Sequence, residues 1–153
     1  MEYFSSLKSK LIYVFRINDA EHRGCLKIGE ATCEEDDILS LKPNSKPLNQ
    51  AAKKRINQYT QTAGIAYELL YTELTIFIQH GSLHSFNDKE VHEVLERSGI
   101  KKKIFDRARK ANEWFITDLE TVKKAIAAIK AGRKSLAPNE ITQNRSPIGF
   151  RPE

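Results

Sequence analysis

The sequence predicts an α+β fold, with a small mixed or antiparallel sheet of about three strands flanked by helices. Its length of 153 residues, with 40% hydrophobic and 29% charged residues, suits one domain with a core of its own. Segments rich in β-branched and aromatic residues predict strands at 11–17, 25–29 and 65–78. Apolar residues at spacings of three and four predict helices at 48–61, 88–97 and 117–132.

The first two strands are expected to form a hairpin. The apolar segment LIYVFRI is followed by the polar residues 18–24, which end in Gly24, and CLKIG then resumes an apolar/polar alternation around Lys27. This order is typical of a β-hairpin whose loop is longer than two residues. Residues 30–47 contain an acidic cluster and two prolines, and they predict a loop.

The later elements follow from periodicity and capping residues. Asn87, with Glu90 three residues on, predicts a capped helix that ends at Ser98–Gly99. NEWFI is short and apolar, and it is a candidate final strand. Thr117 and Glu120 predict a second capping box, whose helix runs to about Gly132. The inward residues of the two long amphipathic helices are expected to be Leu48, Ala52, Ile56 and Tyr59, and Leu119, Val122, Ile126 and Ile129.

The sequence divides into a domain and a tail. Residues 1–132 form the predicted domain, while residues 133–153 are polar, contain three prolines and show no period. These features predict a linker.

Composition narrows the classes of partner. Lys and Arg number 25 against 20 Asp and Glu, and the net charge of +5 favours an anionic partner such as nucleic acid. No apolar run approaches the roughly 20 residues of a membrane helix, so no membrane association is expected. Cys25 and Cys33 form no CxxC motif. Two free thiols and a reducing, cytoplasmic location are therefore expected.

The motifs in their order resemble a known family. LIYVF followed by LKIG resembles the paired GIY and YIG segments of the GIY-YIG nuclease superfamily. Arg55 follows in the first helix, and FNDKEVHEVLERSGI resembles the family's carboxylate-and-His helix. ANEWFITDLE resembles the Glu-Trp-Phe ending of a short phage-type branch, in which KIG replaces YIG. This chain departs from the family at Leu11, where Gly is usual, at Lys27, where Tyr is usual, and at Asp88, where Glu is usual.

The resemblance implies a metal-dependent endonuclease that hydrolyses DNA phosphodiester bonds. Tyr13 would activate water, Lys27 would lower the pKa of that phenol, Arg55 would stabilise the phosphorane charge, and His92 would assist. Asp88 or Glu90 would hold Mg²⁺ or Mn²⁺, and Glu113 is a candidate to complete the site. Residues 88 and 92 share a helix face, which favours Asp88 over Glu90.

Each of these residues also has a structural interpretation. Tyr13 suits a strand core, Lys27 an edge strand, Arg55 a solvated helix face, Glu90 a helix cap, and His92 a partly buried position. A further set of basic residues suits contact with the phosphate backbone of DNA. This predicted set comprises Lys53, Lys54, Lys101, Lys102, Lys103, Arg107 and Arg109.

The C-terminal residues suggest a larger protein. PIGFRPE resembles the segment that precedes the first ATP-binding motif in many helicases and type III restriction subunits. A fused helicase domain is therefore an expected partner, although these residues contain no Walker motif of their own. Two rivals to the nuclease stay open: a non-catalytic DNA-binding or regulatory module of such a helicase, and a protein-interaction domain.

Overall fold

The computed structural model describes residues 9–34, 38–60, 64–105 and 114–141. It confirms the α+β class, with an antiparallel sheet of four strands and a separate two-stranded hairpin. The strands are β1 (Ser9–Arg16), β2 (Cys25–Cys33), β3 (Glu68–Leu74), β4 (Ile76–Gln79), β5 (Ser82–Ser85) and β6 (Trp114–Ile116). The helices are α2 (Lys46–Thr60), α3 (Asp88–Arg97) and α4 (Leu119–Lys130), with short 3-10 turns η1 (Ile38–Ser40) and η2 (Pro138–Glu140).

The main sheet has the order β3-β1-β2-β6 and contains the predicted β1–β2 hairpin. The expected loop from residue 30 is wrong at its start, because β2 continues to Cys33 and pairs with β1 as far as Ser9. Alternation persists through these residues, since Ala31 and Cys33 are buried. Glu30 therefore belongs to a strand, whereas its charge had grouped it with the acidic loop.

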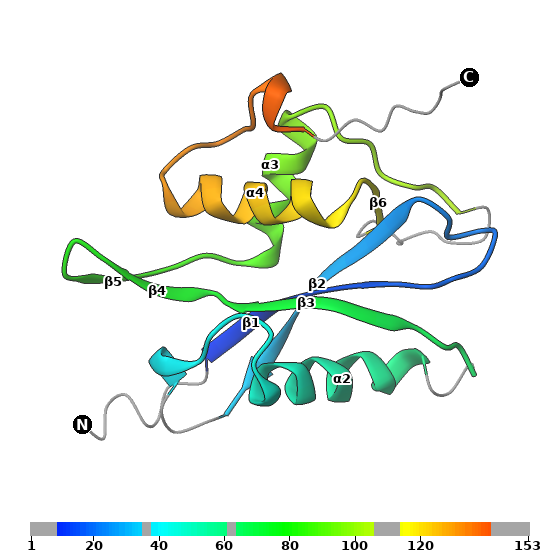
Figure 1. Cartoon of the computed structure of the whole chain (residues 1–153), viewed down its shortest axis with the longest axis horizontal. Coiled ribbons are helices and arrows are strands. Elements are labelled where there is room, and N and C mark those ends of the chain that lie inside the picture. Colours follow the sequence, from blue (N-terminus) through cyan, green and yellow to red (C-terminus); the bar gives the residue numbers. More distant parts are fainter. Residues whose placement is uncertain (1–8, 35–37, 61–63, 106–113, 142–153) are drawn as a thin grey trace.

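Helices cover both faces of this sheet (Figure 1). The apolar odd-numbered residues of β1, such as Leu11 and Phe15, form one cluster with Leu48, Ala52 and Ile56 of α2. This confirms the stripe predicted for α2 at those three positions; the side chain of Tyr59 lies outside the described residues.

The opposite face of the sheet packs against the two later helices. Ile12 and Val14 of β1 and Ile28 of β2 form the second cluster with α3 and α4. Side chains alternate between the two faces of a strand, so the odd and even residues of β1 belong to different cores.

The single strand predicted at 65–78 is instead two strands. Thr75 interrupts it by donating its N–H and its hydroxyl to the Lys10 carbonyl, both at 3.0 Å, after which β4 leaves the main sheet. β4 pairs with β5, which lies outside the predicted strands. Positive φ angles at His80 (53°) and Gly81 (78°) suit the two-residue turn of a twisted hairpin.

Of the two predicted capping boxes, one is present in the structure and the other is not. The box predicted at Asn87 is confirmed, because Asn87 Oδ1 accepts from the Glu90 N–H at 2.9 Å and Glu90 Oε1 accepts from the Asn87 N–H at 3.0 Å. The box predicted at Thr117 is wrong. Asp118 is the cap, and its carboxylate accepts from the Thr121 N–H at 2.9 Å.

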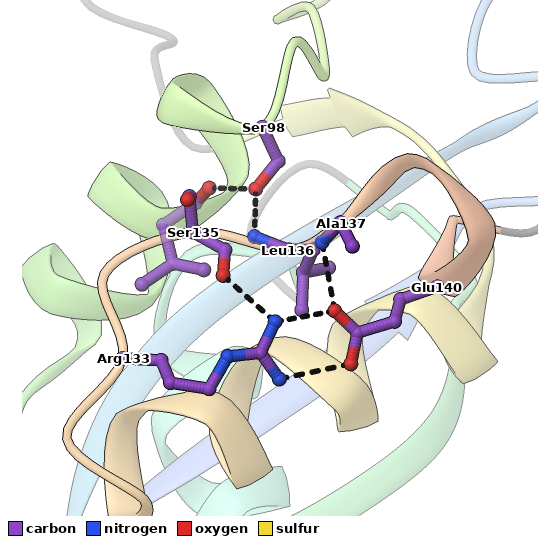
Figure 2. A network of polar contacts seen from close by, with 7 residues as sticks. Ser98, Arg133, Ser135, Leu136, Ala137 and Glu140 are labelled. Atoms are coloured by element: carbon purple, nitrogen blue, oxygen red, sulfur yellow. Dashed lines mark hydrogen bonds and ion pairs between the residues drawn. The ribbon is translucent and has the colours of Figure 1, made fainter.

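Residues 133–141, which we call the strap, pack against the domain although they fall in the predicted linker. Leu136 is buried, and its N–H donates to Ser98 Oγ at 2.8 Å. Arg133 Nη1 donates to Glu140 Oε2 at 2.9 Å, and Glu140 also accepts from the Ala137 N–H (Figure 2). The buried leucine and its hydrogen bond to Ser98 fix the strap to the end of α3, while the ion pair joins two residues of the strap itself. Any linker therefore begins beyond it.

Among the described residues, no helix combines the length and the apolar character needed to cross a bilayer. Cys25 and Cys33 are both buried, and burial raises the pKa of the Cys25 thiol.

Candidate functional site

Tyr13 and Lys27 lie on one face of the β1–β2 hairpin. Tyr13 is opposite Gly29 and Phe15 is opposite Lys27 in the antiparallel register. Because directly opposed residues point to the same face, the phenol and the ammonium project toward the α2 layer. Tyr13 is only 2% exposed, and its ring stacks on Phe15 at 5.9 Å between centroids.

Lys27 occupies an interior strand, so the edge-strand interpretation of this lysine is wrong. β2 pairs with β1 on one side and with β6 on the other, where Lys27 is opposite Trp114. The side chain is half-buried on the face that also carries Cys25. A solvated edge position therefore does not account for this lysine.

Gly29 makes room for the tyrosine ring. A Cβ atom at this position would lie 2.5 Å from both Cζ and Oη of Tyr13, well inside van der Waals contact. The phenol therefore lies directly over the backbone of β2, and the glycine of the KIG segment is needed for this approach.

Arg55 lies beside the buried stripe of α2. Its neighbour Ile56 is fully buried against the sheet, whereas Arg55 is exposed and its Nη1 donates to Gln58 Oε1 at 2.9 Å. Arg55 therefore belongs to the layer that covers the face carrying Tyr13 and Lys27. Lys53 and Lys54 are exposed on the same helix.

His92 and Asp88 come from the opposite layer. His92 Nε2 lies 2.9 Å from the Ile28 carbonyl oxygen, and its ring packs 5.2 Å from that of Phe115. The Asp88 N–H donates to Glu30 Oε1 at 3.0 Å. α3 thus meets β2 at residues 28 and 30, beyond the part that pairs with β6.

The two halves of the predicted site therefore share one short piece of β2. Tyr13 lies over Gly29 from the α2 side, while His92 and Asp88 contact Ile28 and Glu30 from the α3 side. The structure brings Tyr13 together with Lys27, and it brings Asp88 and His92 to the same strand segment. The two pairs approach that segment from opposite faces of the sheet.

Glu30 is a candidate site residue that the sequence analysis missed. Its carboxylate accepts from the Asp88 N–H and lies 3.2 Å from Lys10 Nζ, with the side chain 17% exposed. The sequence signal that could have identified Glu30 is the apolar/polar alternation of this strand, which continues past Gly29. An acid held against the first turn of a helix is electrostatically favourable.

The two candidate metal carboxylates, Asp88 and Glu90, have different surroundings in the structure. Glu90 is engaged in the α3 capping box, and it lines a cavity of about 300 Å³ together with Arg97 and Arg133. Asp88 is half-buried beside Glu30. Within the described ranges, no three His, Cys, Asp or Glu side chains are grouped to hold a metal.

Carboxylate chemistry still suits one hard cation at this place. Mg²⁺ often binds through one or two carboxylates, with water and substrate phosphates as its other ligands. Asp88 and Glu30 supply such oxygens.

The lysine run at 101–103 extends the sheet beyond β6. The Lys103 N–H donates to the Trp114 carbonyl at 2.8 Å, and the Lys101 carbonyl accepts from the Ile116 N–H at 2.9 Å. Lys102 pairs with Glu96 at 2.8 Å. Arg107, Arg109 and Glu113 lie outside the described residues.

Comparison of the chain with protein-family models, with curated proteins and with solved structures gives no match. The case for a function therefore depends on the motifs and on the placement of the residues that carry them.

Proposed function

We propose that this chain is a metal-dependent endonuclease domain of the GIY-YIG type, which hydrolyses DNA phosphodiester bonds. The observation that carries the proposal is the common face of Tyr13 and Lys27 on the β1–β2 hairpin. Two residues chosen from separate motifs are thereby neighbours on adjacent strands, as a joint role requires.

The phenol and the two cations have complementary tasks in this proposal. A phenol has an ordinary pKa of about 10, so it acts as a base only where nearby positive charge favours the phenolate. Lys27 is the diagonal neighbour of Tyr13, a relation that places the two residues about 7–8 Å apart, with a somewhat shorter separation between Cβ atoms. Arg55 would bind the phosphate and stabilise the negative charge that grows on it during attack by water.

The α3 layer would supply the acid and the imidazole. Asp88 would hold Mg²⁺ or Mn²⁺, with Glu30 beside it, and such an ion neutralises phosphate charge and polarises a phosphoryl oxygen. His92 donates Nε2–H to the Ile28 carbonyl in its neutral form, so Nδ1 is the nitrogen left to exchange a proton or contact phosphate.

A second candidate is a non-catalytic DNA-binding module. The burial of Tyr13 favours it, because a side chain that is 2% exposed and stacked on Phe15 has little access to an attacking water. In that case Tyr13 is a core residue, and the exposed lysines of α2 would hold the DNA backbone.

Plasmid nicking by the full chain, with and without Mg²⁺, separates the two candidates. The nuclease proposal expects Mg²⁺-dependent nicking that falls by about 10²–10³-fold in Arg55→Ala, as when one transition-state donor is removed. Tyr13→Phe keeps the ring but removes the base, and it should also abolish nicking. Arg97→Ala removes an exposed arginine that pairs with Glu93, and it is the matched control.

Thermal unfolding of each variant shows whether lost nicking reflects lost fold. Salt-sensitive DNA binding without metal-dependent nicking would reject the nuclease in favour of the module. Unchanged nicking by Arg55→Ala would reject the role assigned to Arg55.

The proposal extends to the context of the domain. We expect it to be the N-terminal part of a larger helicase-type or restriction-type protein located in the cytoplasm. The motif PIGFRPE and the absence of a CxxC motif from the sequence support this expectation.

A further inference from the structure

A cavity of about 830 Å³ opens at the end of the sheet where β1 turns into β2. Its wall combines the loop after β1 with Leu70 of β3 and the start of α4. Cavities that bind small molecules usually have volumes of about 300–1,000 Å³, with apolar walls and a few polar groups. Leu26, Leu70 and Leu119 give this cavity an apolar floor.

His22 is held rigidly at this cavity. Asp19 Oδ1 accepts from the His22 N–H at 2.8 Å and lies 2.7 Å from His22 Nδ1. These hydrogen bonds hold the pKa of Asp19 below its usual value, so the carboxylate stays ionised and Nδ1 is the donor. The imidazole also packs 4.9 Å from Phe105 and 4.7 Å from Trp114, between ring centroids. Within the part of the chain that the structure describes, Nε2 has no hydrogen-bond partner.

Among the described residues, the charged groups around the cavity leave one arginine without an ion-pair partner. Arg16 pairs with Glu68 at 2.9 Å, and Asp118 is engaged in capping α4. Asp19 is engaged by His22. Arg23 lines the same cavity, and its guanidinium makes no ion pair or side-chain hydrogen bond with any described residue.

We infer that this cavity binds one unpaired nucleotide, with its phosphate at Arg23 and His22 and its base over the leucine floor. A guanidinium and an imidazole are the side chains suited to a phosphate, and an apolar floor suits the face of a base. The inference rests on the proposed function, which supplies DNA as the source of the nucleotide.

The position of the cavity fits a nucleotide about three base steps from the cleaved linkage. Arg16 is three residues beyond Tyr13 on β1, which is about 10 Å at the rise of a strand. That separation spans about three steps of stacked bases at roughly 3.4 Å each. A strand cut near Tyr13 would therefore place at the cavity a nucleotide about three steps from the cleaved linkage.

The test uses Trp114, the single tryptophan, as a reporter in contact with His22. The full chain, without metal, is titrated with deoxyadenosine monophosphate, with deoxyadenosine and with inorganic phosphate, and calorimetry provides a second readout. We expect saturable binding of the nucleotide, and binding at least about tenfold weaker for the nucleoside, because a charge-assisted contact contributes about 1.5–3 kcal/mol. Arg23→Ala should weaken nucleotide binding by about the same factor, while Arg97→Ala should leave it unchanged.

The source of the nucleotide is tested with single-stranded and duplex oligonucleotides of one sequence. Single strands should compete with the mononucleotide better than the duplex does. Absence of nucleotide binding, equal binding of nucleotide and nucleoside, or an unchanged Arg23→Ala variant would overturn the inference. Better competition by the duplex would overturn the assignment to an unpaired nucleotide.

These outcomes are distinct from those of the nicking assay. Binding that depends on Arg23 in a chain that does not nick DNA would retain this site and reject the nuclease. Nicking without nucleotide binding would reject this site alone.

Discussion

Gly29→Ala tests the close approach of Tyr13 to β2. The added methyl group would lie 2.5 Å from Tyr13 Cζ and Oη, and the ring has little room to move because it is buried and stacked on Phe15. Overpacking of this kind costs about 1–3 kcal/mol in the free energy of unfolding. At about 2–4 °C per kcal/mol for a chain of this size, the midpoint of thermal unfolding should fall by roughly 2–12 °C.

A second background identifies the cause of that loss. Tyr13→Leu removes the ring, so Gly29→Ala should cost clearly less in this background, and a double-mutant cycle measures the difference by denaturant unfolding. Gly99→Ala is the matched control. Gly99 has a φ of +90°, so an alanine there strains the backbone, but its Cβ atom would have no other atom within 4 Å. Its cost should be equal in both backgrounds. An equal cost of Gly29→Ala in both backgrounds would refute the packing argument.

Further predictions concern the strap and the caps. Leu136→Ala should lower the free energy of unfolding by about 2–5 kcal/mol in denaturant unfolding, because Leu136 is buried. The exposed Leu39→Ala is the control and should change that free energy by less than about 0.5 kcal/mol, which is also the change expected at Leu136 if the strap were a linker. Arg133 lowers the pKa of Glu140 from 4.5 to about 2, so the pair stabilises the fold above pH 4.5 and is lost as the pH falls toward 2. Glu140→Gln should therefore lower the melting temperature most above that range, and an equal difference at low pH would contradict it. Asn87→Ala should cost about 0.5–2 kcal/mol by removing the α3 cap, and an unchanged unfolding midpoint would contradict that role.

Local signals were sufficient for most elements of the fold. The β1–β2 hairpin, the α2 stripe and the Asn87 cap depend on alternation, helical spacing and one capping residue. The β4–β5 hairpin was missed because His80 occupies a left-handed turn position that usually carries Gly or Asn. The interruption at Thr75 depends on hydrogen bonds to Lys10, far away in the sequence, which no local pattern contains.

The candidate site was predictable only in part, because some of its features depend on local sequence patterns and others on contacts between distant residues. The shared face of Tyr13 and Lys27 follows from the spacing of two strands in one hairpin. The layer of His92 depends on which face of the sheet α3 covers, and that is decided by the burial of Val91 and Leu95 in the second core cluster. Glu30 was hidden because its charge placed it among loop acids, although it lies in β2.

The location of a bound Mn²⁺ ion tests the central claim most directly. A crystal of the full chain soaked in Mn²⁺ and examined by anomalous scattering would locate the ion. The account predicts one ion on the Asp88 carboxylate near Glu30, on the segment of β2 that lies beneath Tyr13. An ion bound elsewhere, or no ion bound to any carboxylate of α3 or β2, would contradict it.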